Sequence, residues 1–580
     1  MSVIHSAGEP LPHIPDNMTL AHFMLNYRHP TRPAVPVEHP LMIEDATGRL
    51  IYSEETRHET NALAAELISR FHIGEQHCAC VLSVCIFSPN HVLWPVAVWA
   101  LHKIGAVVTP ANPAYTVEEL VHQLKISRAT LIIVHPMVYP VAATAARESG
   151  IALQKIVLVE RASDGKTDFG SHSTISEMIQ AGAGHAARFV ERPLKPGEAR
   201  KKLAFLCFSS GTTGLPKAVA ISHYSLVANL VQIATYINSD LSPWEKKQCR
   251  TGDVALADIY GLLFVMHYML YNGMPLVVMP KFEFASFLKN IERYRINYIP
   301  LVPPIMLLLC KHPDVKKHNM SSIRTIVSGA APLSGELTQQ LSEVLPNVSI
   351  AQGYGMTETA VAVSLPRLDR KIGAPGSVGV LIPGVSARIV RPDGSLAGRN
   401  EPGQLVVTGP AMAQGYLNDE KATGETFVDG WVYTGDEVMI NDTGELFIVD
   451  RIKELLKVKG FQVAPAELEG FLLDHPDVSD VCIVGIHDDY NGDIPIAFVV
   501  PSANALLRIQ ADAVEADRIK HALVEYVAAG KAHYKQLTGG VTFIDAIPRN
   551  ASGKLLRRLL RDTARSIWES GKLSKEKTKL

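Results

Sequence analysis

The sequence lacks the features that mark secreted, membrane-spanning and nucleic-acid-binding chains. Its 580 residues include only seven cysteines, an odd number that favours reduced intracellular thiols over a disulfide framework. No apolar run is long enough to span a membrane, and the first 17 residues lack the basic and apolar regions of a signal peptide. Basic and acidic residues nearly balance, 56 against 58, so the charge predicts no nucleic-acid partner and no membrane surface.

Internal repeats and low-complexity linkers are also missing. The composition, 47% hydrophobic and 20% charged, is that of an ordinary globular protein, and the length requires at least two domains. Cys78, Cys80 and Cys85 lie close together, but their apolar run, CACVLSVCIF, is typical of a buried strand. We therefore interpret these cysteines as core residues and not as metal ligands.

Most of the chain alternates short apolar strands with amphipathic helices, which predicts an α/β fold with largely parallel sheets. The pattern changes near Gly430, where GWVYTGDEVMINDTGELFIVDR predicts two antiparallel strands joined by an Asp-Thr-Gly turn. A smaller α+β segment follows and ends in a basic helix from about Gly553. We expect an N-terminal domain of residues 1–450 and a C-terminal domain of residues 451–580.

The segment SSGTTGLPK between two apolar strands has the chemistry of a phosphate-binding loop. Glycines let backbone N–H groups approach an anion, hydroxyls add donors, and the lysine adds a positive charge. The alternative is a flexible surface turn, but a turn needs neither the Pro-Lys pair nor two buried flanking strands. The residues assigned to phosphate binding are Ser209, Ser210, Gly211, Thr212, Thr213, Gly214 and Lys217.

Five further motifs follow in order: SGAAPL (328–333), QGYGMTET (352–359), GWVYTGD (430–436), DRIKELLKVKGFQVAPAELE (450–469) and IPRNASGKLLRR (547–558). With the first loop they resemble the adenylate-forming superfamily of acyl-CoA synthetases, luciferases and peptide-synthetase adenylation domains. The plant and fungal 4-coumarate–CoA ligase-like branch is the nearest. The resemblance covers almost the whole chain and implies an α/β domain of parallel-rich sheets flanked by helices, a β-barrel-like subdomain, and a smaller mobile α+β domain.

The resemblance implies an adenine slot between small residues and an aromatic ring. Small side chains permit close approach of a base, and a ring such as Tyr354 stacks on it. Gln352 would contact the adenine edge. Gly329, Ala330 and Ala331 would form the opposite wall, and Gly353 and Gly355 are assigned to the ATP and AMP site as a whole.

The ribose and phosphates of ATP would be held by polar residues of the same motifs. Asp436 would accept hydrogen bonds from the ribose hydroxyls, with Arg451 as a second contact. Thr357 would contact phosphate, and Glu358 would hold Mg²⁺, which prefers oxygen ligands and bridges phosphates. The alternative for each residue is a surface or turn position, and Glu358 taken alone favours that alternative. As a set, however, the residues indicate a nucleotide site.

Lys554 is predicted to stabilise the negative charge that develops when a carboxylate attacks the α-phosphate. The alternative is that it belongs to the solvated face of the terminal basic helix. The resemblance also assigns Lys453 as the hinge between the domains. Lys457 and Gln462 would serve the two half-reactions.

The acyl and CoA tunnel is predicted from two segments. In ALADIYGLL, Asp258 stands where the family has histidine, which leaves the substrate range and the thioester step open. Its neighbours Ile259 and Tyr260, together with Val361, would give an apolar acyl pocket, although such residues are equally good core. The turn that would line the pantetheine tunnel is Lys459, Gly460 and Phe461.

The resemblance implies an ATP-dependent acyl-CoA ligase that uses ATP, Mg²⁺ and CoA to activate an aromatic or fatty carboxylic acid through an acyl-AMP. One alternative is an acyl-AMP ligase that loads a carrier protein of a polyketide or nonribosomal peptide pathway. Another is an inactive acyl-adenylate-binding scaffold. The last residues, Thr578-Lys579-Leu580, resemble the peroxisomal tripeptide Ser-Lys-Leu, so we expect a cytoplasmic or peroxisomal location.

Overall fold

The structure is a computed structural model of the 580-residue chain. It describes residues 3–71, 82–161, 169, 172–209, 216–238, 260–329, 333, 335–367, 370, 372–458, 461–488, 492–512, 514–549 and 555–569. Several predicted site residues lie outside this part of the chain, so their predictions stay untested. They are residues 210–214, Asp258, Ile259, Ala330, Ala331, Lys459, Gly460, Lys554, 578–580 and the side chain of Gln462.

A six-stranded sheet forms the first core, in the order β7 (Ile156–Leu158), β6 (Ala129–Val134), β4 (Ser83–Phe87), β5 (Val107–Ala111), β8 (Leu203–Ser209) and β9 (Lys217–Ser222). Every pair is parallel except β8–β9, which confirms the predicted parallel-rich α/β fold. Strand β4 is buried throughout, as in sheets covered on both faces. Cys85 is completely buried there, which confirms its interpretation as a core residue.

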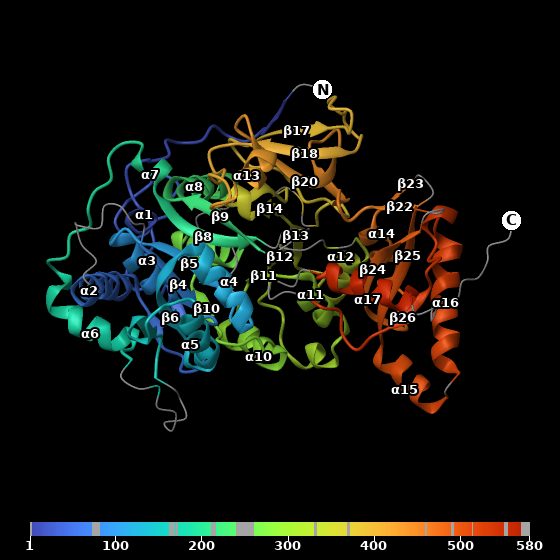
Figure 1. Ribbon diagram of the computed structural model, residues 1–580, viewed down its shortest axis with the longest axis horizontal. Helices are drawn as coiled ribbons and strands as arrows, with labels where there is room; N and C mark the ends of the chain where they lie inside the picture. Colours follow the sequence, from blue (N-terminus) through green and yellow to red (C-terminus); the bar gives the residue numbers. More distant parts are fainter. Residues whose placement is uncertain are drawn as a thin grey trace.

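Alternate residues of β4 enter two different cores because side chains point to opposite faces along a strand. Val84 and Ile86 join the cluster around α3 (Trp94–Lys103) and α8 (His223–Asn238). Cys85 and Phe87 join the cluster of α4 (Val117–Ser127) and α5 (Tyr139–Glu148). Figure 1 shows these helices around the sheet. The described part of this region also contains α1 (Leu20–Leu25), α2 (Ser53–Phe71), α6 (Ile175–Ala186) and α7 (Glu198–Lys201).

Two more groups of strands extend the large domain. The first comprises β10 (Leu276–Val278), β2 (Met42–Glu44) and β3 (Leu50–Ile51), and the parallel set β11 (Tyr298–Leu301), β12 (Thr325–Ser328) and β13 (Ser349–Gln352). Its helices are α10 (Phe284–Tyr294), α11 (Pro303–Lys311) and α12 (Gly335–Val344). The second is antiparallel: β14 (Tyr354–Met356), β15 (Val361–Leu365) and β16 (Val380–Leu381).

A third, antiparallel sheet lies above these layers in Figure 1, next to the N-terminus. Its order is β1 (Ile4–His5), β17 (Ser386–Val390), β18 (Gly403–Thr408), β20 (Trp431–Ile440) and β19 (Phe427–Val428), with β21 (Leu446–Arg451) also on β20. The antiparallel β20–β21 pair confirms the predicted hairpin. The barrel-like form is not confirmed: in the described part of the chain no strand pair closes this sheet.

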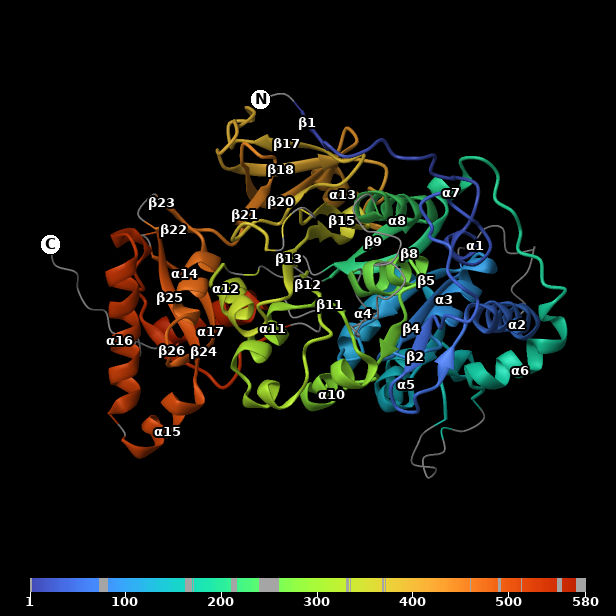
Figure 2. The ribbon, with the colours of Figure 1, turned by 180° about the vertical axis from the view of Figure 1, so that it is seen from behind.

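The C-terminal region is a smaller α+β unit at one end of the molecule (Figures 1 and 2). Its sheet runs β23 (Phe461–Val463), β22 (Leu456–Val458), β25 (Gly492–Pro501) and β24 (Val478–Asp488), with β26 (Val541–Phe543) on β25. Its helices are α14 (Pro465–Leu473), α15 (Ala503–Ala511), α16 (Glu515–Gly530) and α17 (Arg557–Glu569).

Two buried clusters of this region use only residues between Leu456 and Ala564. The boundary at residue 450 itself stays a prediction. Lys311 of the large region donates to the Val478 carbonyl at 3.1 Å, and Gln340 donates to Asp474 at 3.1 Å. Among the helices that the structure describes, none combines the length and the apolar composition of a membrane span.

Candidate nucleotide-binding site

The two described ends of the predicted phosphate loop, Ser209 and Lys217, belong to the antiparallel β8–β9 pair. Ser209 ends β8 and Lys217 begins β9, and the two are register partners. The buried apolar runs on both sides fix these ends, as the sequence predicted. The hydroxyl and the lysine are therefore held at one edge of the sheet, on either side of the loop.

Glu358 is a buried carboxylate held by two hydroxyls from distant segments. Its side chain is 5% exposed, and Oε1 accepts from Ser209 Oγ at 3.2 Å and from Tyr416 OH at 2.8 Å. Burial and the nearby Glu358 raise the pKa of the Tyr416 phenol, so Tyr416 stays a donor. This arrangement aligns one carboxylate beside the phosphate loop.

The backbone next to Glu358 is strained. Glu358 lies in a short 3₁₀ turn, Thr357–Thr359, and the next two residues have positive φ angles, 50° at Ala360 and 111° at Val361. Such a conformation costs on the order of 1–3 kcal/mol in a β-branched residue and is found mainly at functional sites. The turn fits because the residue opposite it, Gly355, has no side chain. A Cβ at Gly355 would lie 1.5 Å from the Val361 carbonyl oxygen, so only glycine fits there.

A second polar group joins Tyr354, Asp436 and Arg451. Tyr354 OH donates to Asp436 Oδ2 at 2.6 Å, and Arg451 Nε lies 3.5 Å from Oδ1 of the same carboxylate. The hairpin register brings this about, because Asp436 in β20 pairs with Arg451 in β21. Burial, strengthened by Asp436, raises the pKa of Tyr354 well above its usual range, so its hydroxyl stays protonated.

The described wall of the adenine slot comes from neighbouring parallel strands. Gly329 directly follows β12, and Gln352 ends the adjacent β13. The Tyr260 ring lies against Gly329, where an added Cβ would approach it to 2.8 Å. Tyr260 also stacks on Phe264, with ring centroids 5.4 Å apart. The predicted slot and the predicted acyl pocket therefore adjoin at Tyr260.

The remaining described residues of the prediction belong to the C-terminal region. Lys453 is exposed between β21 and β22, and Lys457 pairs with Gln462 across the β22–β23 hairpin. Phe461 is 55% exposed and stacks on Tyr534, with centroids 4.5 Å apart. No contact given for the described residues connects these residues to Asp436 or Glu358, so their roles stay predictions.

The sequence interpretation missed Tyr416 and Asp419. Tyr416 donates to Glu358 across 58 residues of chain, and Lys217 Nζ lies 3.4 Å from Asp419 Oδ2. Both residues belong to GYLND, a polar turn with no local pattern that connects it to phosphate chemistry. Only the pairing of this segment with β9 reveals the connection.

The chemistry of this site fits a magnesium ion bound together with phosphates. In the described part of the chain, no three His, Cys, Asp or Glu side chains converge as a metal site would require. Glu358 is a single buried carboxylate, and among the described residues both of its hydrogen-bond donors reach Oε1. Oε2 is therefore the oxygen suited to a cation that keeps its other ligands from phosphate and water.

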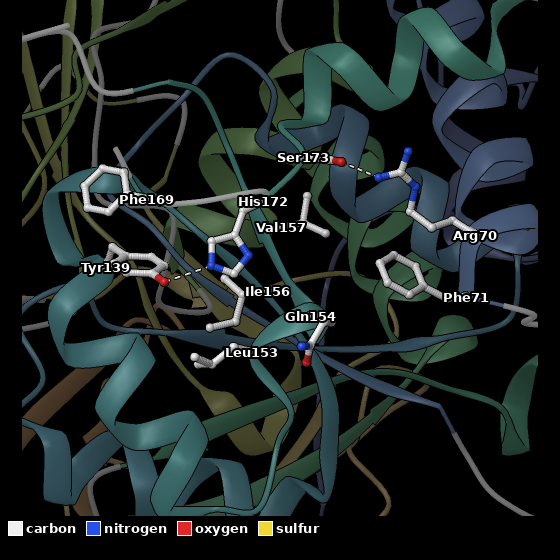
Figure 3. Close-up of a pocket in the computed structure, with 10 residues that line it drawn as sticks. All are labelled: Arg70, Phe71, Tyr139, Leu153, Gln154, Ile156, Val157, Phe169, His172 and Ser173. Carbon is white, nitrogen blue, oxygen red and sulfur yellow. Dashed lines mark hydrogen bonds between the residues drawn. The ribbon is translucent and has the colours of Figure 1, made fainter. Parts of the chain in front are cut away.

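A separate cavity of about 350 Å³ lies in the N-terminal region (Figure 3). Tyr139 OH and His172 Nε2 are 2.8 Å apart in its wall, and Arg70 donates to Ser173. Its lining includes none of the predicted nucleotide residues. We assign it no role in the reaction.

Known protein families and relatives match most of the chain. The model of the family "AMP-binding enzyme" matches residues 26–417, and that of the "AMP-binding enzyme C-terminal domain" matches residues 467–554. The chain is 36% identical over 563 residues to 4-coumarate–CoA ligase 2 of Oryza sativa subsp. japonica, covering 94% of each chain. It is 35% identical over 538 residues to 4-coumarate–CoA ligase 2 of Solanum tuberosum, covering 90% of each.

Two solved structures have the same fold. The anthranilate CoA ligase AuaEII in complex with anthranoyl-AMP has a TM-score of 0.79 at 22% identity, over 96% of this chain and 99% of that one. ATP-bound MatB from Rhodopseudomonas palustris has a TM-score of 0.77 at 24% identity, over 95% of this chain and 100% of that one.

Proposed function

The chain belongs to the AMP-binding enzyme family, and from this premise we propose that it is an AMP-forming acyl-CoA ligase. In the first half-reaction a substrate carboxylate oxygen attacks the α-phosphorus of ATP, and the bond to pyrophosphate breaks. In the second, the CoA thiolate attacks the acyl carbon and AMP leaves. The products are acyl-CoA, AMP and pyrophosphate.

One observation supports this proposal above the others. Two polar groups are connected by a short segment of the chain, because Tyr354 belongs to one group and Glu358, four residues later, belongs to the other. Asp436, held by Tyr354 and Arg451, offers carboxylate oxygens that suit ribose hydroxyls. Glu358, held by Ser209 and Tyr416, lies beside the phosphate loop. Their order along the chain matches ribose at one end of the segment and phosphate at the other.

Each described residue then has a defined role in holding ATP. Tyr354 presents an aromatic face for adenine, Asp436 orients the ribose, and Lys217 offsets phosphate charge. Glu358 would hold Mg²⁺, which when bound neutralises phosphate charge and orients the leaving group. Lys554 is expected to supply the last positive charge at the α-phosphate.

We propose an aromatic carboxylic acid as the substrate class. The stacked rings of Tyr260 and Phe264 lie beside Gly329, and Val361 is buried nearby on β15, so the surface next to the slot is apolar and partly aromatic. The relatives named 4-coumarate–CoA ligase support the same class. A fatty acid is the alternative that an apolar pocket also admits.

The test is pyrophosphate release with purified protein, measured over a panel of hydroxycinnamic, benzoic and fatty acids of increasing length. Each acid is assayed without acceptor, with CoA, and with a phosphopantetheinylated carrier protein. We expect release with aromatic acids and acyl-CoA formation only with free CoA. Acyl transfer to the carrier protein alone would favour the carrier-loading alternative. Binding of a synthetic acyl-AMP without any pyrophosphate release would favour the scaffold.

A further inference from the structure

The segment before α13 (Glu420–Thr426) pairs with β9. Tyr416 bridges to Val219, and the backbone bonds Ala220 N to Gly415 O and Leu417 N to Ala218 O are 2.9 and 2.8 Å long. Strand β9 begins at Lys217. The pairing therefore holds this segment next to the lysine of the phosphate loop.

Lys217 contacts two residues of this segment. Its Nζ lies 3.4 Å from Asp419 Oδ2 and 5.2 Å from the centroid of the Tyr416 ring. Both charged side chains are more than one-third exposed, 38% for Lys217 and 36% for Asp419. The pair is therefore open to exchange with a ligand, unlike a buried ion pair.

The Asp419 carboxylate is fixed independently of the lysine. Its Oδ1 accepts from the Ala422 N–H at 2.9 Å and caps the first turn of α13. Hydrogen bonding from Ala422, and then the Lys217 charge, lower its pKa, so it is ionised at neutral pH. When a polyanion takes Lys217, Asp419 stays behind as a negative charge close to the phosphates.

We propose that Asp419 competes with the phosphates of ATP and pyrophosphate for Lys217. The inference rests on the proposed function in that it takes the loop to bind nucleotide. Entry of ATP exchanges one partner of the lysine for another, and departure of pyrophosphate returns the lysine to Asp419. The carboxylate thereby weakens binding of both polyanions, which favours release of the product.

The test is the variant Asp419→Asn, which removes the charge and keeps the helix cap, because Asn caps as well as Asp. Calorimetric titration with Mg·ATP and with magnesium pyrophosphate, without any acid, measures binding without turnover. We expect both dissociation constants to fall by about two- to fivefold, the range of an exposed ion pair. The gain shrinks at high salt, while the thermal midpoint stays unchanged.

Glu420→Gln is the matched control, since it removes the same charge from the adjacent, exposed residue. We expect Glu420→Gln to lower both dissociation constants by less than Asp419→Asn does. In a Lys217→Met background, Asp419→Asn should lose its advantage over this control. Asp419→Ala, which also removes the cap, should lower the thermal midpoint and still bind both polyanions more tightly.

Three results would overturn the inference: unchanged or weaker binding in Asp419→Asn, an equal gain in Glu420→Gln, or a gain that persists without Lys217. Failure of the unmodified protein to bind Mg·ATP is a different outcome, because it contradicts the proposed function itself.

Discussion

Two arginine–carboxylate contacts in this molecule differ in almost every respect. Arg451 approaches Asp436 through one nitrogen, Nε, at 3.5 Å, and one-third of its side chain is exposed. Arg557, at the start of α17, binds Glu469 through both Nη atoms at 2.8 Å and is 7% exposed. Its Nε also donates to Glu454 at 3.1 Å.

The difference separates an interaction that leaves room for a ligand from one that holds the fold together. Among the described contacts, this single one is made by a side chain that is one-third exposed, so it leaves donors of Arg451 available for ribose or phosphate. A bidentate, buried contact uses the guanidinium completely and is stabilised by the low local dielectric. Arg557 therefore ties α17 to α14 and to Glu454, which follows the predicted hinge residue Lys453.

The largest expected effect comes from Arg557→Ala, which leaves Glu469 buried without its partner. We expect the free energy of unfolding to fall by about 3–5 kcal/mol. Denaturant unfolding measures it, and Arg558→Ala is the matched control, because Arg558 is exposed on the same helix. Equal losses in the two variants would contradict the distinction between the two arginine contacts.

Lys554→Ala should slow the reaction without changing stability, whereas Arg557→Ala should lower the stability of the fold. We expect acyl-AMP formation to fall by about 10²–10³-fold, typical of one lost transition-state contact, with unfolding unchanged. Pyrophosphate exchange measures this step, and transfer from supplied acyl-AMP to CoA measures the other. The assignment is wrong if both half-reactions fall equally.

Tyr354→Phe tests the site around Asp436 and Arg451, since it removes the hydroxyl that donates to Asp436 and keeps the ring. We expect the KM for ATP to rise about tenfold. This corresponds to about 1.4 kcal/mol, near the lower end of the free energy that a hydrogen bond to a charged group contributes. Discrimination between ATP and its 2′,3′-dideoxy analogue should shrink as well. If discrimination is unchanged, Asp436 does not contact the ribose.

The sequence predicted the parallel α/β core and the β20–β21 hairpin because both depend on local patterns. Apolar runs such as that of β4 and the Asp-Thr-Gly turn specify strands and turns by themselves. The prediction that Tyr354, Asp436 and Glu358 belong to one site came from the resemblance, and their contacts were beyond any local pattern. The barrel-like form was not confirmed because strand closure depends on pairings between distant segments.

Local sequence patterns do not reveal contacts between residues that are distant in sequence. Three residues show this: Tyr416, Asp419 and Arg557. Each acts through a partner distant in sequence: 58 residues away for Tyr416 and Glu358, and 88 for Arg557 and Glu469. In the sequence, Arg557 is one of several basic residues at the start of the terminal helix, and nothing in their order distinguishes it from Arg558. The burial of Arg557 follows from packing of α17 against β24, which no helical periodicity specifies.

The smallest expected effect is a dependence of stability on pH that originates in the buried groups around Glu469 and Arg557. Burial raises the pKa of Glu469 to about 7 against the opposing charge of Arg557, and burial also raises the pKa of Asp450. Glu454, Cys482 and Arg557 are the other groups that face Glu469. The folded protein therefore binds more protons than the unfolded chain between the ordinary glutamate pKa and about 7.

Because of this difference, the free energy of unfolding should fall as pH rises from about 5 to 7, by on the order of 1 kcal/mol. Glu469→Gln should flatten that slope, whatever it does to the absolute stability. Glu467→Gln, two residues earlier on α14, is the matched control: against the opposing effect of burial, Lys535 and Lys531 lower the pKa of Glu467, so it stays ionised across this window. Denaturant unfolding at pH 5.5 and 7.5 measures all three proteins, and a slope that is the same in all of them would show that Glu469 is not the group that titrates.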